Sequence, residues 1–397
     1  MPGQHPPGSG PALILAATAF TMMVGWLVKA PCLGSWADGR QYNRLCYSDV
    51  AALYASDDRD RGLDEDRIPY VEAENEYPVL TGVAMWIAAL PATSHGSFFN
   101  WTAALLMGAA LVTAWYLHRL TGNRALLFAL SPTLAIYGLM NWDLLAVALA
   151  TGATFAFLRH RDGSAGILLG LGAATKIYPA LLLIPFAMER LRQQRASDAA
   201  RLAATAGLTW GAVNLPFAVP AFDRWSEFFR FNSARPADWD SLWFVGEHYL
   251  GVGWDPPALN VLVVVAFVVT VAAVWRTAAA LPGFRAWTLG FPVVALFLLT
   301  NKVYSPQYGL WLLPWFALAL PDIRLFAAFQ VADLVVFVTR FQFFAEHQAV
   351  GPGLPFWMFQ AAVVVRAAIL ILCIVAWIRR QSAEHTEPLP LPEAATA

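Results

Sequence analysis

Apolar segments follow one another along most of the chain, and short polar turns separate them. The segments cover residues 12–30, 98–118, 125–141, 143–158, 164–176, 177–189, 201–220, 258–275, 286–301, 306–320, 324–340 and 356–378. None of them alternates apolar and polar residues with a period of two, so they predict helices rather than barrel strands. Since only helices and closed barrels satisfy their backbone groups inside a bilayer, the sequence predicts an all-α, polytopic membrane protein.

The composition supports lipid as the natural solvent of this chain. Of its 397 residues, 58% are hydrophobic and 13% are charged, whereas a soluble domain carries about 25% charged residues. So few charges cannot cover the surface of a water-soluble protein of this size. The net charge of −1 indicates no nucleic-acid partner.

Longer polar segments divide the chain into regions. Residues 1–11 and 381–397 contain several prolines and are expected to be disordered, while residues 12–380 are expected to form one transmembrane domain. Two long loops are expected at 31–97 and 221–257. Within the first loop, residues 77–91 are apolar but short, which fits either a short span or a helix at the membrane interface.

Basic residues in the short loops predict the orientation, because such residues concentrate on the cytoplasmic side. They are Arg119, Arg124, Arg159, Arg161, Arg190, Arg192, Arg195, Arg201, Arg276, Arg285, Arg324, Arg379 and Arg380. All of them lie on one side if 77–91 does not span and 164–189 forms a hairpin of two short helices. This arrangement predicts about twelve transmembrane helices, two cytoplasmic termini, and extracytoplasmic loops at 31–97 and 221–257.

The short outer turns hold isolated polar residues. These are Asp143, Lys176, Tyr178, Lys302, Tyr304 and Gln307. Ionisable groups at membrane depth are costly, and those that occur are more often functional than not. Two lysines near the outer boundary would suit an anionic group at that depth, such as a lipid phosphate.

Asp49 and Asp143 each permit two interpretations. Each stands where a helix is expected to begin, in CYSDVAALY and MNWDLLAV, so Asp143, and either Ser48 or Asp49, could simply cap those helices. Alternatively, a carboxylate at the membrane surface could act as a general base toward an acceptor hydroxyl. The local sequence favours neither interpretation.

Other polar and aromatic residues are also ambiguous. Cys32 and Cys46 share the first outer loop, where a disulfide is permitted, and the sequence leaves a bridge and two free thiols equally open. The acidic residues between 57 and 76 show no metal-ligand spacing and are expected to form a solvated face. The aromatic residues of 221–257, Trp243 among them, fit either membrane anchoring or stacking on a sugar.

Three arginines stand apart from the cytoplasmic set. Arg235 lies in the second outer loop and could reach a phosphate. Arg340 lies near an outer helix end, where its side chain can reach the interface. Arg366 lies well inside the last apolar segment and must face a partner or the interior of the bundle.

Several short motifs on the outer side resemble the GT-C superfamily of polyprenyl-phosphate-dependent glycosyltransferases, and most closely family 87, the α-mannosyltransferase-like group common in actinobacteria. They are CYSDVAALY with Asp49, EYPVLTG with Tyr77, NWD with Asp143, Thr175-Lys176-Ile177-Tyr178-Pro179, and SPQY at 305–308. The resemblance extends over about residues 12–340. Two departures are Val79, where many relatives have a second proline, and the single acid at Asp49, where a pair would suit a bound metal.

The resemblance implies a GT-C-like fold and roles for particular residues. It implies Asp49 as the catalytic base. The donor phosphate is expected at Lys176, Lys302, Tyr178, Tyr304 and Gln307. The acceptor and sugar are expected at Asp143, Tyr77, Glu76 and Trp243. No cofactor and no tightly bound metal are expected, because a lipid phosphate is already a good leaving group.

The expected function is therefore that of a plasma-membrane glycosyltransferase with an extracytoplasmic active site. It would move a sugar, with mannose ahead of arabinose, from a polyprenyl-phosphate donor to a glycolipid or glycan acceptor, with inversion at the anomeric carbon. A lipid or solute transporter or flippase is the alternative, but transporters often contain two related halves, and no such repeat is present. A scaffold of an envelope-synthesis complex is a third reading.

Overall fold

The computed structural model describes residues 10–34, 38–54, 63 and 67–383, and the described chain is almost entirely helical. Its helices are α1 (Pro11–Lys29), η1 (Ala30–Cys32), α2 (Arg40–Asn43), α3 (Asp49–Ala52), α4 (Val79–Ala89), α5 (His95–Thr121), η3 (Gly122–Ala125), α6 (Leu126–Ala129), α7 (Pro132–Tyr137), α8 (Asp143–Leu158), α9 (Asp162–Thr175), α10 (Tyr178–Leu181), α11 (Leu183–Arg192), α12 (Ala196–Ala218), α13 (Phe222–Trp225), α14 (Glu227–Ala234), α15 (Leu242–Leu250), α16 (Pro256–Ala279), η4 (Ala286–Leu289), α17 (Gly290–Thr300), η5 (Pro306–Leu312), α18 (Leu313–Ala319), α19 (Ile323–His347) and α20 (Phe356–Ala383). The expected all-α membrane fold is confirmed. Of the termini expected to be disordered, 1–11 and 381–397, residues 1–9 and 384–397 lie outside the described residues, whereas Pro11 begins α1 and residues 381–383 belong to α20. Much of the acidic stretch also lies outside the described residues.

Four helical segments are long and apolar enough to cross a membrane: Pro11–Cys32, His95–Ala129, Pro256–Ala279 and Phe356–Ser382. Other apolar segments are broken into shorter pieces, such as α10 and α11 over 178–192, or η5 and α18 over 306–319. The count of about twelve spans stays a prediction. The segment 77–91 forms α4, whose 11 residues extend about 16 Å and are too short to cross a bilayer core of about 30 Å.

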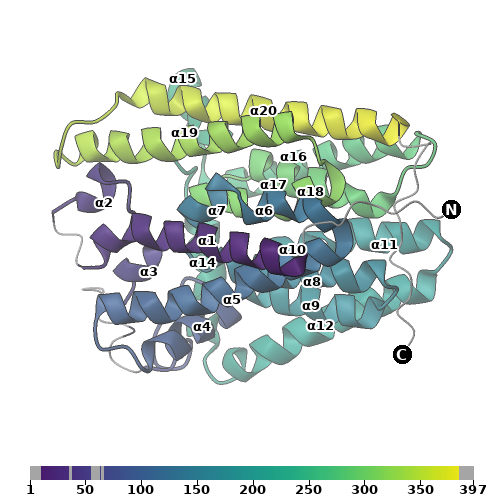
Figure 1. Ribbon diagram of the computed structural model, residues 1–397, viewed down its shortest axis with the longest axis horizontal. Helices are drawn as coiled ribbons and strands as arrows, with labels where there is room; N and C mark the ends of the chain where they lie inside the picture. Colours follow the sequence, from purple (N-terminus) through teal and green to yellow (C-terminus); the bar gives the residue numbers. More distant parts are fainter. Residues whose placement is uncertain (1–9, 35–37, 55–62, 64–66, 384–397) are drawn as a thin grey trace.

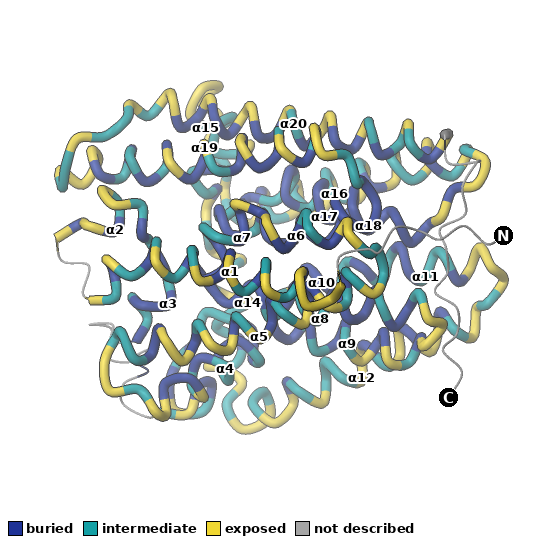
Figure 2. The backbone as a smooth tube through the Cα atoms, in the orientation of Figure 1, coloured by how far each residue is buried: buried dark blue, intermediate teal, exposed yellow. Residues whose placement is uncertain are grey.

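The long helices run roughly side by side along the longest axis of the molecule (Figure 1). α19 and α20 pack against each other along one edge, and α9 lies between α8 and α12 toward the opposite edge. Helices α8, α17 and α18 form the buried centre, whereas yellow, exposed positions dominate the outside (Figure 2). Only 6% of the apolar 18-residue stretch of α16 is buried, which fits a helix whose side chains face lipid.

Several turns that were expected on the extracytoplasmic side gather at one end of the bundle, where α2, α3 and the turn between α19 and α20 lie (Figure 1). The Asn43 side chain donates a hydrogen bond to the backbone oxygen of Val350, 2.7 Å away, and so joins the first outer loop to that last turn. Cys32 and Cys46 form a disulfide in the structure, with their Cα atoms 5.8 Å apart. This end of the bundle holds the candidate site.

Candidate active site

Asp49 is the first residue of α3, and its carboxylate is held by contacts from outside that helix. The Tyr47 hydroxyl donates to Oδ1 over 2.7 Å, and Nδ2 of Asn141 donates to Oδ2 over 2.8 Å. Ser48 occupies the N-cap position but forms no capping bond. Its hydroxyl donates instead to the backbone oxygen of Leu139, 2.7 Å away. The carboxylate is therefore positioned by tertiary contacts rather than used as a helix cap.

A cavity of about 510 Å³ lies beside Asp49. It is formed by segments far apart in sequence, and its walls include seven of the residues to which the resemblance gave a catalytic or binding role. These are Asp49, Glu76, Tyr77, Lys176, Tyr178, Lys302 and Gln307. The wall carries both carboxylates and cations, which is the combination that a general base and an anion-binding group require.

Asp143 lies beneath this cavity rather than on its wall. It is fully buried at the start of α8. Its Oδ2 lies 3.5 Å from Nζ of Lys176, and its Oδ1 accepts a hydrogen bond from the Trp311 indole over 2.7 Å. A buried carboxylate needs such partners, since an uncompensated charge is costly. Asp143 is thus the counter-ion of Lys176, and no capping bond is formed at this helix start.

Lys176 is surrounded by aromatic rings. Its amine lies 5.0 Å from the centre of the Tyr77 ring and 5.9 Å from that of Tyr308. Tyr178 and Tyr308 both stack on Trp311, with ring centres 4.3 and 4.0 Å apart. The Thr175–Pro179 and 305–308 motifs, which are more than a hundred residues apart, therefore form one wall.

Lys302 is held by the outer loop that precedes α15. Its amine donates to the backbone oxygens of Arg235 and Ser233, over 2.6 and 3.2 Å. An ammonium has three donors, so these two bonds leave one for a ligand in the cavity. Burial, together with the nearby Arg235 charge, lowers the pKa of Lys302 below its ordinary value.

Two of the residues expected to bind substrate are placed elsewhere. The ring of Tyr304 is buried, with the Arg366 guanidinium 3.5 Å from its centre. The Trp243 indole donates to the backbone oxygen of Thr300 over 2.7 Å and packs edge-on against Trp254. Neither Tyr304 nor Trp243 lines the cavity. Both belong to the surrounding framework.

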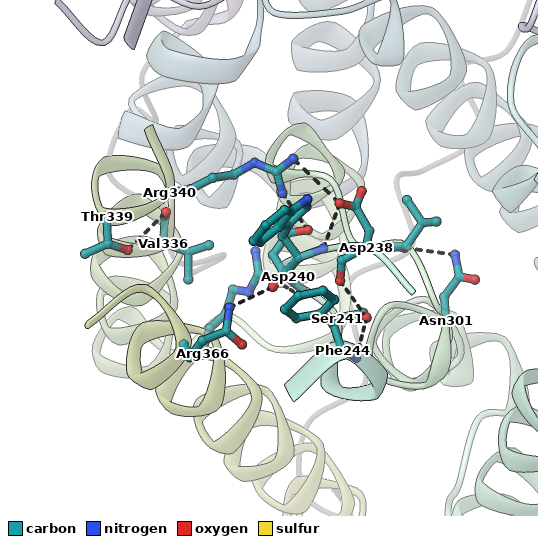
Figure 3. A network of polar contacts seen from close by, with 12 residues as sticks. Asp238, Asp240, Ser241, Phe244, Asn301, Val336, Thr339, Arg340 and Arg366 are labelled. Atoms are coloured by element: carbon teal, nitrogen blue, oxygen red, sulfur yellow. Dashed lines mark hydrogen bonds and ion pairs between the residues drawn. The ribbon is translucent and has the colours of Figure 1, made fainter. Parts of the chain in front are cut away.

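The cavity wall also contains charged residues to which the sequence assigned no site role. Arg340 of α19 lies 2.7 Å from Oδ1 of Asp240 and 3.7 Å from Oδ1 of Asp238 (Figure 3). Asp238 also pairs with Arg235, over 3.2 Å. Burial raises the pKa of Asp240 to about 6, although the Arg340 charge opposes that shift. Asp238 thus links two arginines of the cavity wall.

Arg366 was expected to face either a partner or the interior of the bundle, and the structure buries it in the interior. Its guanidinium lies 3.3 Å from Oδ1 of Asp333, and it also donates to the backbone oxygen of Asp240 over 3.1 Å. No signal in the sequence distinguishes Arg340, because an isolated arginine near a helix end suggests only contact with the membrane interface.

The described residues contain no group of three or more His, Cys, Asp or Glu side chains arranged to hold a metal ion. Asp49, Glu76 and Asp238 line the same cavity, but in the described part of the chain no three such side chains lie close enough together to hold a metal ion. The geometry therefore rests on hydrogen bonds and ion pairs.

The model of glycosyltransferase family 87 matches residues 76–306, more than half of the chain. The protein belongs to this family. The family 87 match includes Glu76, Tyr77, Asp143, Lys176 and Lys302, while Asp49 precedes it. The cavity thus joins residues from the family region to the first outer loop.

Among solved structures, the chain is similar to ArnT from Cupriavidus metallidurans, whose crystal structure has undecaprenyl phosphate bound. The two share 13% sequence identity and a TM-score of 0.44 over 94% of this chain and 78% of the other. No curated protein matches the sequence.

Proposed function

We propose that this member of family 87 transfers a sugar from a polyprenyl-phosphate donor to an extracytoplasmic glycolipid or glycan. Mannose is the first sugar to test and arabinose the second. Asp49 acts as the general base in a single displacement that inverts the anomeric carbon. The active site faces the outside of the plasma membrane, and both termini are cytoplasmic.

The observation that carries this proposal is a pair of adjoining cavities with different walls. Beside the polar cavity lies an apolar one of about 320 Å³, lined by residues such as Leu169, Ala173 and Trp210. The two cavities share five wall residues, Tyr77, Pro78, Ile177, Phe228 and Phe229. A lipid-linked sugar has the same two parts, an apolar tail and a charged, hydroxyl-rich head.

The cations of the polar cavity suit the phosphate of such a donor. Lys302 keeps one ammonium proton for a ligand, and Lys176 lies beside Tyr77 and Ile177, where the two cavities meet. When the bond between the anomeric carbon and the phosphate oxygen breaks, negative charge grows on the phosphate. Cations fixed in advance at that position stabilise the transition state, and the effect increases when water is excluded.

Asp49 suits the base role because its orientation is fixed. Tyr47 and Asn141 each donate to one carboxylate oxygen, and each oxygen retains further acceptor capacity. One of them can take the proton from an acceptor hydroxyl as that oxygen attacks the anomeric carbon. The transition state is oxocarbenium-like, as in other glycosyl transfers, and the proton ends on Asp49 while the lipid phosphate leaves.

The test is sugar transfer by the purified protein in lipid nanodiscs. Radiolabelled polyprenyl-phosphate mannose, and separately the arabinose donor, are supplied with a membrane glycolipid extract. The Asp49→Asn variant should bind the donor but lose at least about 100-fold in turnover. The matched control is Asp223→Asn, because that carboxylate is 95% exposed and does not line the cavity.

Two results would contradict the proposal in different ways. Near wild-type turnover by Asp49→Asn would remove the base assignment but leave the donor class standing. Absence of donor binding by the wild-type protein would remove the polyprenyl-phosphate donor itself.

A further inference from the structure

Lys29 is a buried cation to which the proposed reaction assigns no task. It is the last residue of α1 and is 0% exposed. Within the described residues it forms no direct ion pair, and its amine lies 5.3 Å from the centre of the Phe337 ring. Removing an ammonium from water is costly unless something compensates it. Its placement therefore calls for a specific contact.

That contact is to the segment that carries the candidate base. The Lys29 amine donates to the backbone oxygen of Tyr47 over 2.7 Å. The hydroxyl of the same tyrosine donates to Asp49 Oδ1 over 2.7 Å. The opposite charges of Lys29 and Asp49 also attract each other. A single residue, Tyr47, thus connects the end of α1 to the carboxylate.

A covalent link lies directly beside this hydrogen bond. Cys32, three residues after Lys29, forms the disulfide with Cys46, the residue before Tyr47. Lys29 at the end of α1 and Cys32 at the end of η1 are therefore joined to the adjacent loop residues Tyr47 and Cys46. Such a double connection fixes the direction of the loop as well as its distance from α1.

The other side of the same segment is held by the turn before α8. The Ser48 hydroxyl donates to the backbone oxygen of Leu139, and the Asp49 backbone N–H donates to that of Met140 over 2.9 Å. Asn141 completes the set through the carboxylate. Residues 46–49 are thus fixed between two walls, and Lys29 with the disulfide forms the α1 wall.

We propose that Lys29 is a positioning residue for Asp49. Together with the Cys32–Cys46 disulfide it holds residues 46–49 so that the carboxylate points into the cavity. This inference rests on the proposed function, since it takes Asp49 as the base. The inference goes beyond the proposed function because it makes turnover depend on a cation and a disulfide that touch no substrate.

The kinetic test compares Lys29→Met with Lys29→Arg. Misplacing a reacting group by a fraction of an ångström slows turnover without weakening binding. Lys29→Met should therefore lower kcat about tenfold or more and leave the KM for donor and acceptor within about twofold. Lys29→Arg keeps a charged donor and should recover most of kcat. Arg276→Met, at an exposed position on α16, is the matched control and should be unchanged.

The disulfide gives an independent test that needs no substitution. Reduction of the wild-type protein with a phosphine, checked by mass spectrometry, should lower kcat in the same way. The Cys32→Ser/Cys46→Ser double variant should already have the lower kcat of the reduced protein, and adding the phosphine should not change it. If Lys29→Met fails to fold, the reduction experiment alone tests the proposal. Full activity after complete reduction would then overturn it.

Hydrogen–deuterium exchange separates this proposal from the proposed function, because it needs no substrate. Amides of residues 46–54 should exchange faster in Lys29→Met and in the reduced protein than in the wild type. Unchanged exchange, or an unchanged kcat in Lys29→Met, would overturn the positioning role. If the wild type transfers no sugar, the proposed function fails, while the exchange data still decide whether Lys29 holds the segment.

Discussion

Nζ of Lys176 lies 3.5 Å from Oδ2 of Asp143, which lies beneath the cavity wall. The pair is asymmetric, because the Asp143 side chain is fully enclosed whereas the Lys176 side chain is 11% exposed. Lys176 therefore borders the cavity with its charge already balanced from below. Among the described residues, Lys302 has only backbone oxygens as hydrogen-bond partners, so the two lysines are not equivalent toward an anionic ligand.

This asymmetry predicts unequal effects on stability. Lys176→Met leaves the Asp143 carboxylate buried with Trp311 as its remaining partner, and should destabilise the protein by about 3 kcal/mol or more. Asp143→Asn leaves a cation that can turn toward the cavity, and should cost about 1–2 kcal/mol. Unfolding in detergent measures both, and the double variant should lose less than the sum of the single ones. Additive losses would show that the two residues do not interact.

Lys302 is predicted to act on the donor more than on the acceptor. Lys302→Ala removes a cation from the cavity wall and should raise the KM for a polyprenyl-phosphate sugar about tenfold. The acceptor KM should change little. Steady-state kinetics with each substrate varied in turn makes the comparison. An unchanged donor KM would exclude Lys302 from phosphate binding.

The lowered pKa of Lys302 predicts a pH dependence of donor binding. A lysine whose folded pKa lies below the ordinary value loses its proton earlier as the pH rises, and the neutral amine no longer attracts a phosphate. The donor KM should therefore increase on the alkaline side, beginning below pH 10.5, the ordinary lysine value. Lys302→Arg should remove this increase, since arginine stays protonated throughout. The same alkaline rise in Lys302→Arg would assign it to another group.

The apolar cavity predicts a dependence on donor chain length. Ala173 lines that cavity, and Ala173→Phe fills part of it. The variant should raise the KM for a long polyprenyl donor about tenfold, while a donor with two or three isoprene units should be affected far less. Ala272→Phe, at an exposed position on α16, is the control. Equal effects on long and short donors would mean that the tail binds elsewhere.

The sequence allows a prediction wherever the structural role of a residue depends on its neighbours along the chain. Apolar segments predicted the helices, and the turns containing Lys176 and Lys302 predicted two cations of the cavity. Tyr304 was assigned to the site because it stands in the turn of Lys302, and Trp243 because it belongs to the aromatic loop 221–257. Which way such a side chain points depends on tertiary packing, however, and neither Tyr304 nor Trp243 lines the cavity.

The part of the site that the sequence did not predict depends on contacts between distant segments. Arg340 gains its position from Asp238 and Asp240, about a hundred residues earlier in the chain. Lys29 acquires a role only because its amine meets the backbone of Tyr47. Ordinary interfacial lysines and arginines look the same in a one-dimensional pattern. Only the folded arrangement distinguishes them.

The wall shared by the two cavities has a consequence for how such an enzyme can diversify. Phe228 and Phe229 of α14 line both cavities, but most other wall residues line only one of them. The lipid and the sugar of a donor would therefore contact largely separate sets of residues. A change in one set can alter the accepted isoprenoid without altering the accepted sugar, and the reverse also holds. Related proteins could therefore differ in sugar preference while using the same carrier lipid. New glycans could then arise without a new lipid donor.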